Sequence, residues 1–279
     1  MGIFPVVVMC RLFGVSRSGF YNWIRVAPQK NQNRYELLRV IEKVHQGSRN
    51  TYGSPRVFRM VKALGYRVSK RVVEQIMREN GIKAKKKGRY KATTNSKHAL
   101  PVSPNLVDRN FDRGALNRVW LSDITYLQTE KGWGYLATVM DAHTRKIVGW
   151  SLATYMRVDL VIAALRDAIG RESPPHGVIL HSDRGSQYAS KEYRALLHQH
   201  GFLQSMSRRG NCWDNAPMES FYDTLKTEHA FHERYIDIGH AREKIFEWIE
   251  VFYNRQRMHS SLGYMSPACF EQKSMAKAA

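Results

Sequence analysis

The sequence predicts an α/β protein in two parts: a small, basic, all-helical region, then a mixed sheet with helices. Charge is divided the same way. Of the formal net charge of +20, residues 1–110 carry 23 Lys+Arg against 5 Asp+Glu, and residues 111–279 carry the remaining 21 against 19. The hydrophobic pattern changes from helical spacing before residue 92 to β-rich runs after residue 117. A basic half joined to a nearly neutral half favours nucleic acid as a partner.

Composition excludes several other classes of protein. Hydrophobic residues make up 43% of the chain, enough for a core, so wholesale disorder is not expected. The cysteines, Cys10, Cys212 and Cys269, are far apart and form no C-x-x-C pair, which argues against a disulfide framework or a zinc knuckle. The apolar start lacks a basic n-region and a cleavage site, and no run approaches a membrane span of about 20 residues. We expect a cytoplasmic, nucleoid-associated protein without a membrane partner.

Residues 1–30 predict a helix-turn-helix-like segment. An apolar helix is followed by a break at Gly14, and Ser16 is placed to cap a second helix. Arg17, Ser18 and Tyr21 would lie at the start of that second helix, where such units meet DNA. Any two-helix corner has this outline, so the pattern alone is a weak signal.

Residues 31–91 predict a basic helical DNA-binding region. A helix is expected at about 34–46, a second from Ser54 to Gly65, and a third from Ser69 to Gly81. The last two helices would bring Arg56, Lys70 and Arg71 to DNA. The basic tract at residues 83–91, "KAKKKGRYK", reads as a solvated linker, and a linker can still hold phosphates.

Residues 92–117, rich in Asn, Ser and Pro, predict a linker, and residues 118–235 predict the main α/β domain. Three apolar, β-rich runs with short turns predict an antiparallel meander. Helices and strands then alternate: helix 158–169, strand 177–183, helix 190–201, strand 202–207 and helix 216–228. Residues 236–279 are expected to form a C-terminal helix and tail.

Three acids fall at informative places on these elements. Asp123 interrupts the first strand, and Asp183 follows "VILHS" at the carboxyl end of a buried strand, where open α/β sheets gather ligands. Glu219 lies in the first turn of a helix begun by Pro217. Carboxylates without a histidine or cysteine cluster favour magnesium or manganese, and two such ions can clamp an in-line attack on phosphorus. Lys226, seven residues after Glu219, shares its helix face and could hold a phosphate.

Each of these features has an ordinary explanation when taken alone: a strand-edge aspartate, a capping glutamate, a solvated pair. Their joint occurrence in a chain with a basic arm predicts a catalytic site. The preceding loop, "GNCWDNA", would fix how the helix begins, and we expect Asp214 and Asn215 to shape that turn by side-chain to backbone hydrogen bonds.

The motifs resemble those of the insertion-sequence-three family of transposases, specifically the product of the second reading frame, over residues 5–272. They are "LSDITYL" around Asp123, "HSDRGSQY" around Asp183, the S-x-x-G-x-x-x-D-N-A-x-x-E-S-F pattern ending at Phe221, "LK" ending at Lys226, and "YNRQRMHSSLGYMSP" at 253–267. Asp183 and Glu219 have 35 residues between them, the spacing of the family's Asp-Asp-Glu triad.

The resemblance implies a ribonuclease H-like, retroviral-integrase-like core in which Asp123, Asp183 and Glu219 hold two Mg²⁺ ions, with Mn²⁺ as a substitute. It implies end nicking by water, then strand transfer by the freed 3′-hydroxyl without a covalent protein–DNA intermediate. The implied partners are double-stranded DNA at the element's ends and target, further copies of the chain on DNA, and a fusion or complex with an upstream-frame product.

Two other functions keep the fold: a DNA-binding regulator or inactive remnant, and a plain ribonuclease H-like nuclease. The intact triad argues against the first, and the basic helices argue against the second. Tyrosine or serine recombinase chemistry would need a nucleophile with an arginine cluster, which the sequence does not arrange. The roles of His181, Arg257 and His259 stay open, and His259 is expected to be a packed tail residue.

Overall fold

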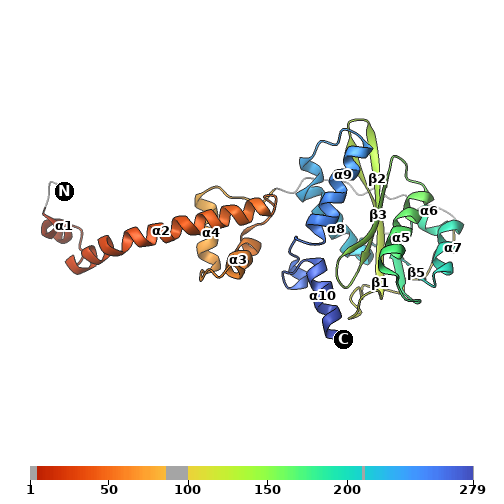
Figure 1. Cartoon of the computed structure of the whole chain (residues 1–279), viewed down its shortest axis with the longest axis horizontal. Helices are drawn as coiled ribbons and strands as arrows, with labels where there is room; N and C mark the ends of the chain where they lie inside the picture. The colour runs from red at the N-terminus through yellow and green to blue at the C-terminus, as the bar shows by residue number, and fades with distance from the viewer. Residues whose placement is uncertain (1–4, 86–99, 209–210, 279) are drawn as a thin grey trace. The chain divides into compact units, whose positions relative to one another are not determined.

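The computed structural model describes residues 5–85, 100–208 and 211–278. The chain divides into two compact units, residues 1–85 and 86–279, each visible as a separate body in Figure 1. The basic tract from residue 86 on and the predicted linker up to residue 99 lie outside the described residues. None of the described helices combines the length and the apolar character needed to cross a bilayer.

The first unit is helical, as predicted. Its helices are α1 (Val6–Leu12), α2 (Arg17–Gly47), α3 (Ser54–Ala63) and α4 (Lys70–Glu79). Gly14, with φ of +64°, makes the turn between α1 and α2, because glycine adopts this left-handed conformation without a steric penalty. The Ser16 hydroxyl then accepts a hydrogen bond from the Gly19 N–H at 3.1 Å and caps α2.

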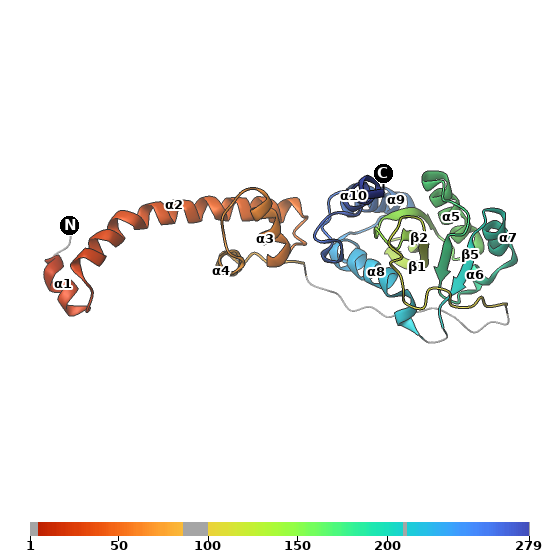
Figure 2. The ribbon, with the colours of Figure 1, turned by 90° about the horizontal axis from the view of Figure 1, so that it is seen from below.

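Helix α2 differs from the prediction, because one helix of 31 residues replaces two shorter ones. It runs through the boundary set at residue 30 and through Pro28, and it is bent in Figure 2. Proline removes one helical hydrogen bond and bends a helix without always ending it. Side-chain hydrogen bonds from Gln29 to Asn33 and from Gln32 to Glu36 support the turns beyond the proline.

The C-terminal half of α2 packs with α3 and α4 around a small core. Fully buried aliphatic side chains come from all three helices: Ile41, Val57, Val61, Val73 and Ile76. An ion pair between Arg34 and Glu79 joins α2 to α4 at the surface. The helices α3 and α4 therefore form where the sequence predicted them, between Ser54 and Gly65 and between Ser69 and Gly81.

The second unit is built on one five-stranded sheet in the order β3-β2-β1-β4-β5. The strands are β1 (Val119–Thr129), β2 (Gly132–Asp141), β3 (Ile147–Ala153), β4 (Ile179–Ser182) and β5 (Leu203–Met206). The first three are antiparallel neighbours, which confirms the predicted meander. Strand β4 pairs in parallel with β1, and β5 pairs in parallel with β4, which completes a mixed sheet.

Helices cover both faces of this sheet (Figures 1 and 2). One face carries α5 (Val158–Glu172), α6 (Ser186–Ala189) and α7 (Lys191–Gln199), and the other carries α8 (Ala216–Glu228) and α9 (Ile238–Phe246). Each face has its own hydrophobic core. At Gly149 of β3 a Cβ would come within 2.5 Å of the Ala164 carbonyl oxygen, so glycine lets α5 lie directly on the strand.

Segments expected to be peripheral belong to the second unit's core. Val107, within the predicted linker, is buried, and the Leu106 N–H donates to the Ser205 hydroxyl at 2.9 Å. After α9 the chain continues as a π-helical segment (Glu247–Tyr253) and ends in α10 (Pro267–Ala278). Trp248 is fully buried in the core shared with α8. The composition of residues 92–117 did not indicate this packing, because a mostly polar segment can be held by a single buried side chain such as Val107 and a few hydrogen bonds.

Candidate active site

Asp123, within β1, and Asp183, directly after β4, lie next to each other where the parallel pairing of these two strands ends. Leu121 of β1 pairs with His181 of β4, and each aspartate comes two residues after its member of that pair. Parallel neighbours are about 4.8 Å apart, and residues two apart share a face. Both carboxylates therefore face the side of the sheet where Leu121 packs in the core with α8.

Backbone amides orient the two carboxylates. An oxygen of Asp123 accepts a hydrogen bond from the Ile124 N–H, and an oxygen of Asp183 accepts one from the Gly185 N–H, each at 2.8 Å. Burial raises the pKa of Asp123 well above its usual range, and repulsion from Asp183 and then from Glu219 raises it further. The site thus concentrates negative charge.

Helix α8 is fixed beside Asp123 by contacts from its buried face. Pro217 stands in its first turn, and the Asn215 amide donates to the Ser122 carbonyl oxygen of β1 at 3.4 Å. One turn after Glu219, the Tyr222 hydroxyl donates to the Asp123 carbonyl oxygen at 2.6 Å. Tyr222 was not predicted as a site residue, because an aromatic in a helix reads as ordinary core.

Glu219 is exposed in the first turn of α8. Partial desolvation raises the pKa of Glu219. Its charge acts on Asp123, so the structure brings the three predicted acids into one neighbourhood. In the described ranges no three Asp, Glu, His or Cys side chains already converge tightly enough to hold one ion. The donor set consists of oxygens alone, which suits a hard cation.

Lys226 does not extend into solvent; it is 7% exposed. Its ammonium lies 4.7 Å from the centroid of the Tyr126 ring, within the range of a cation–π interaction. Burial lowers the pKa of Lys226, and the negative charges of Asp123 and Asp223 oppose that shift. The lysine therefore stands between the acidic site and an aromatic side chain.

Asp214 is the hub of the loop before α8. Its side chain is fully buried, and it accepts hydrogen bonds from the Arg208 backbone N–H at 2.9 Å and from the Arg208 guanidinium at 2.7 Å. Asn105 and Arg109, from the predicted linker, donate to the same carboxylate at 3.1 and 3.3 Å. The Arg208 hydrogen bonds contribute most to holding the pKa of Asp214 far below its usual value.

The three residues whose roles were left open all make contacts within the second unit. His181 is buried between Ser205 and Ser207, at 2.8 and 3.1 Å, and burial lowers its pKa to about 4, so the ring is neutral. Arg257 forms a bidentate ion pair with Glu228 at the end of α8. His259 lies edge-on to the buried Tyr253 ring, 5.0 Å between centroids, which matches the expected packed tail residue.

The predicted DNA contacts of the first unit differ in exposure. Arg17, Ser18 and Tyr21 are exposed on the first turns of α2. In α4, Arg71 is exposed, and Lys70 forms an exposed ion pair with Glu74 at 3.3 Å. Arg56 is half-buried, with its guanidinium 5.4 Å from the Tyr52 ring centroid, so part of its side chain supports the helical bundle.

Both units of the chain match known protein families. Residues 115–212 and 200–267 match two families described as Integrase core domain. Residues 32–90 match the family described as HTH-like domain, which covers the C-terminal part of α2 with α3 and α4. The α1–α2 corner lies outside that match.

Curated relatives match nearly the whole chain. An insertion element IS600 uncharacterized 31 kDa protein of Shigella sonnei is 45% identical over 95% of this chain and 98% of its own length. The transposase InsF for insertion sequence IS3A of Escherichia coli K12 is 38% identical over 98% and 96%.

Similar solved structures include a simian T-cell lymphotropic virus intasome in complex with PP2A regulatory subunit B56 gamma. It has a TM-score of 0.49 and 13% identity, and the match covers 83% of this chain and 74% of that one. Another is the HTLV-2 integrase catalytic core domain in complex with magnesium, at 0.44 and 15%, covering 57% of this chain and 99% of that one.

Proposed function

The chain belongs to the IS3 family of transposases, and we propose that Asp123, Asp183 and Glu219 together form its catalytic site. It has an integrase catalytic core and is an enzyme of the polynucleotidyl transferase class. One observation supports the site assignment above all. The charges of Asp183 and Glu219 both act on Asp123, although the three residues are up to 96 positions apart in the sequence (219 − 123).

The acids fit a divalent cation. The negative charges of Asp183 and Glu219 add to burial in raising the pKa of Asp123, so a cation bound between them would relieve this repulsion, and oxygen ligands suit Mg²⁺ or Mn²⁺. Asp123 and Asp183 would hold the cations from the strand ends, and Glu219 would complete the set from α8. Two bound ions would neutralise this charge and stabilise the attacking and leaving oxygens of a phosphodiester.

The chain's own residues position the DNA. Lys226 would hold a phosphate next to Asp123, and the buried hub at Asp214 would keep the start of α8 at a fixed distance from β1. In the first step water attacks a phosphodiester at the element's end and releases a 3′-hydroxyl. In the second step that hydroxyl attacks another phosphodiester, whose own 3′-oxygen leaves, so no protein–DNA bond forms.

The working assembly would contain more than one copy of the chain. The helix-turn-helix-like unit and the integrase core support binding to double-stranded DNA at the element's ends and at the target. Further copies would bring the two ends together, and an upstream-frame product would join by fusion or association. Such an assembly would act at the nucleoid.

The test of the site is the change Asp183→Asn in the full-length chain. It keeps the shape of the side chain and removes the charge, so strand transfer should fall by roughly 100-fold or more, whereas binding to the element's ends should persist. Gel assays of strand transfer and of end binding with the same duplex measure both. Asp159→Asn, an exposed acid on α5, is the matched control and should transfer normally.

Retained strand transfer by the Asp183→Asn chain would remove this aspartate from the catalytic site. A regulator without catalytic activity would give a different result, because wild type would then bind the ends and transfer neither strand.

A further inference from the structure

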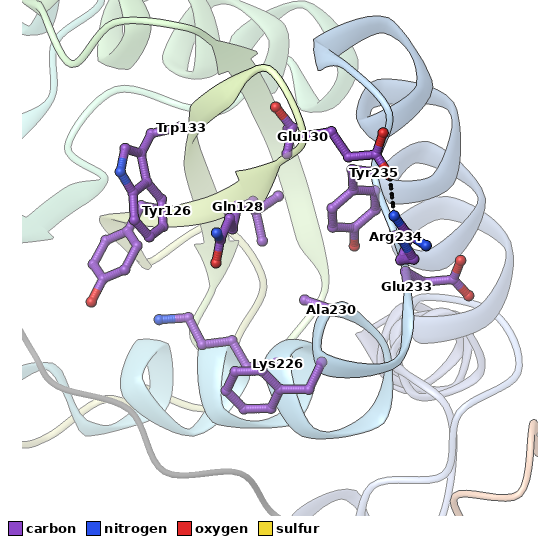
Figure 3. A pocket seen from close by; sticks show the side chains of 12 residues that line it. Tyr126, Gln128, Glu130, Trp133, Lys226, Ala230, Glu233, Arg234 and Tyr235 are labelled. Atoms are coloured by element: carbon purple, nitrogen blue, oxygen red, sulfur yellow. Dashed lines mark hydrogen bonds and ion pairs between the residues drawn. The ribbon is translucent and has the colours of Figure 1, made fainter.

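A pocket of about 510 Å³ lies beside Lys226, between the β1–β2 hairpin and the end of α8 (Figure 3). Its lining includes Tyr126, Gln128, Trp133, Lys226, Phe231 and Tyr235. Lys226 belongs both to this lining and, through its interaction with Asp123, to the electrostatics of the acidic site. The pocket therefore adjoins the candidate active site on the side of its lysine.

Aromatic rings form much of the pocket wall. Tyr126 and Trp133 meet edge-on with 5.2 Å between their ring centroids, and both stand together in Figure 3. Trp133 is 51% exposed, and Phe231 is 45% exposed. Large aromatic side chains usually bury most of their surface, so this group at a concave site indicates a surface for a flat, apolar-faced ligand.

The pocket lining also includes one buried hydroxyl without a hydrogen-bond partner among the described residues. Tyr235 is 2% exposed, its hydroxyl points into the pocket in Figure 3, and that hydroxyl has no hydrogen-bond partner among the residues that the structure describes. A buried hydroxyl without a partner is costly. The exposed amide of Gln128 lies between Tyr126 and Tyr235 in the same view.

Besides Lys226, three charged residues line the pocket: Glu130, Arg234 and Glu233, whose carboxylate lies 3.9 Å from His229 Nδ1. Glu130 and Arg234 pair with each other at 2.9 Å. Such a site suits a neutral ligand with hydrogen-bonding edges and flat faces, joined to a phosphate at the lysine.

We propose that this pocket receives one unpaired base of the DNA held at the catalytic site. A base offers a flat face for Trp133 or Tyr126, and ring nitrogens or carbonyl oxygens that can accept from the Tyr235 hydroxyl. The phosphate of the same nucleotide would lie toward Lys226. The proposal rests on the proposed function, because it requires DNA at Asp123.

An apolar side chain from a second copy of this chain would fit the same aromatic walls. It would leave the Tyr235 hydroxyl without an acceptor, whereas a base supplies one. The unpartnered hydroxyl therefore favours a base.

The test measures binding of the full-length chain to duplexes that carry the terminal sequence of its element, with divalent ions chelated. One abasic position is moved stepwise through the last base pairs on both strands. On intact DNA, Trp133→Ala should weaken binding by roughly 5- to 150-fold, the equivalent of losing one stacked base. Tyr235→Phe should weaken it by roughly 2- to 10-fold. At one abasic position both losses should disappear, because the pocket's occupant is missing there.

Phe246→Ala, an exposed aromatic on α9 outside the pocket, is the matched control and should bind every duplex as wild type does. Tyr235→Phe keeps the ring and removes a hydroxyl that has no partner among the described residues, so its thermal unfolding temperature should be equal to or higher than that of wild type.

An unchanged affinity of Trp133→Ala for intact DNA would overturn the proposal, as would an equal loss at every abasic position. A change in the sedimentation mass of the DNA-free chain on Trp133→Ala, with DNA binding intact, would overturn it in favour of a second copy. Because no metal or cleavage is involved, these outcomes stand apart from the Asp183→Asn test of the catalytic site.

Discussion

At the scale of single residues, Lys226 has a position that a surface lysine would not take. Its stem is buried, its ammonium contacts the Tyr126 ring, and it is the cation that acts on Asp123 from α8. Burial of an ammonium costs free energy, and a nearby negative charge offsets part of that cost. A DNA phosphate next to this ammonium would add a second anion, which is why we assign Lys226 to the cut end.

Changing Lys226 to Ala should weaken binding of a duplex with a cut 3′ end by roughly 10- to 100-fold, the range for a charge-assisted hydrogen bond. The affinity for divalent ions should change much less, since lysine donates no oxygen ligand. Fluorescence anisotropy and isothermal calorimetry measure the two affinities. Lys273→Ala, an exposed lysine on α10, is the control. An equal loss in both variants would show that Lys226 contributes only to net charge.

At the scale of elements, the loop before α8 is held by a carboxylate whose partners come from distant parts of the chain. Arg208 stands at the end of β5, whereas Asn105 and Arg109 belong to the segment before β1. Asp214 therefore connects the segment before β1 and the segment after β5 to the start of α8. Because α8 carries Glu219 and Lys226, this hub sets where both of them lie.

Asp214→Asn should destabilise the chain by about 1–3 kcal/mol, because hydrogen bonds from Arg208 weaken while its half-exposed guanidinium regains water. The loss should depend on pH. The folded-state pKa of Asp214 lies far below the unfolded value of about 3.9, so its contribution is complete above that value and is lost progressively as pH falls from there through the folded-state pKa. Urea unfolding should show the same difference between the variant and wild type at pH 7 and pH 5, and a smaller difference at pH 3.

Asp159→Asn is again the control. Asp159 is exposed in the first turn of α5, where its charge contributes about 0.3–1 kcal/mol, so its loss of stability should be smaller than that of Asp214→Asn. A difference between the Asp214→Asn chain and wild type that stays constant down to pH 3 would mean that the carboxylate's charge is not what holds the loop.

At the scale of the whole molecule, the uneven charge separates two tasks. The first 110 residues carry nearly all of the net charge, and residues 111–279, which hold the candidate catalytic site, are close to neutral. Contacts between cations and phosphates release counterions, so binding through the first unit should be strongly salt-dependent. Local acidity at Asp123 would repel DNA without bound cations, which makes a separate basic unit physically useful.

Binding of the full-length chain to duplex DNA should fall steeply as salt rises from 50 to 200 mM. Arg71→Ala should lower the slope of log K against log[salt] by about one if Arg71 contacts a phosphate. Arg166→Ala, an exposed arginine on α5, removes the same charge from the other unit and should leave the slope unchanged. Equal slopes for wild type and Arg71→Ala would remove this arginine from the DNA-contacting surface.

The sequence alone was enough for the fold class, the meander and the position of the two aspartates. Strand and helix periodicities depend on neighbouring residues, and a carboxylate placed after a buried strand is readable from a few letters around it. The sequence analysis did not predict that α2 continues through Pro28. Proline is visible in the sequence as a residue that ends helices, whereas the side-chain hydrogen bonds that stabilise the following turns are not.

Only the tertiary structure decided how these pieces meet. Two partners of Asp214, Asn105 and Arg109, lie more than a hundred positions upstream. The Tyr235 hydroxyl has no partner among the described residues because of what surrounds it, and the buried Lys226 contacts the ring of Tyr126. The resemblance to a family implied that the acids act together, and the register of β1 with β4 brings the two aspartates side by side. Long-range contacts of this kind have no local pattern, because the energy of a buried polar group depends on neighbours that folding alone brings together.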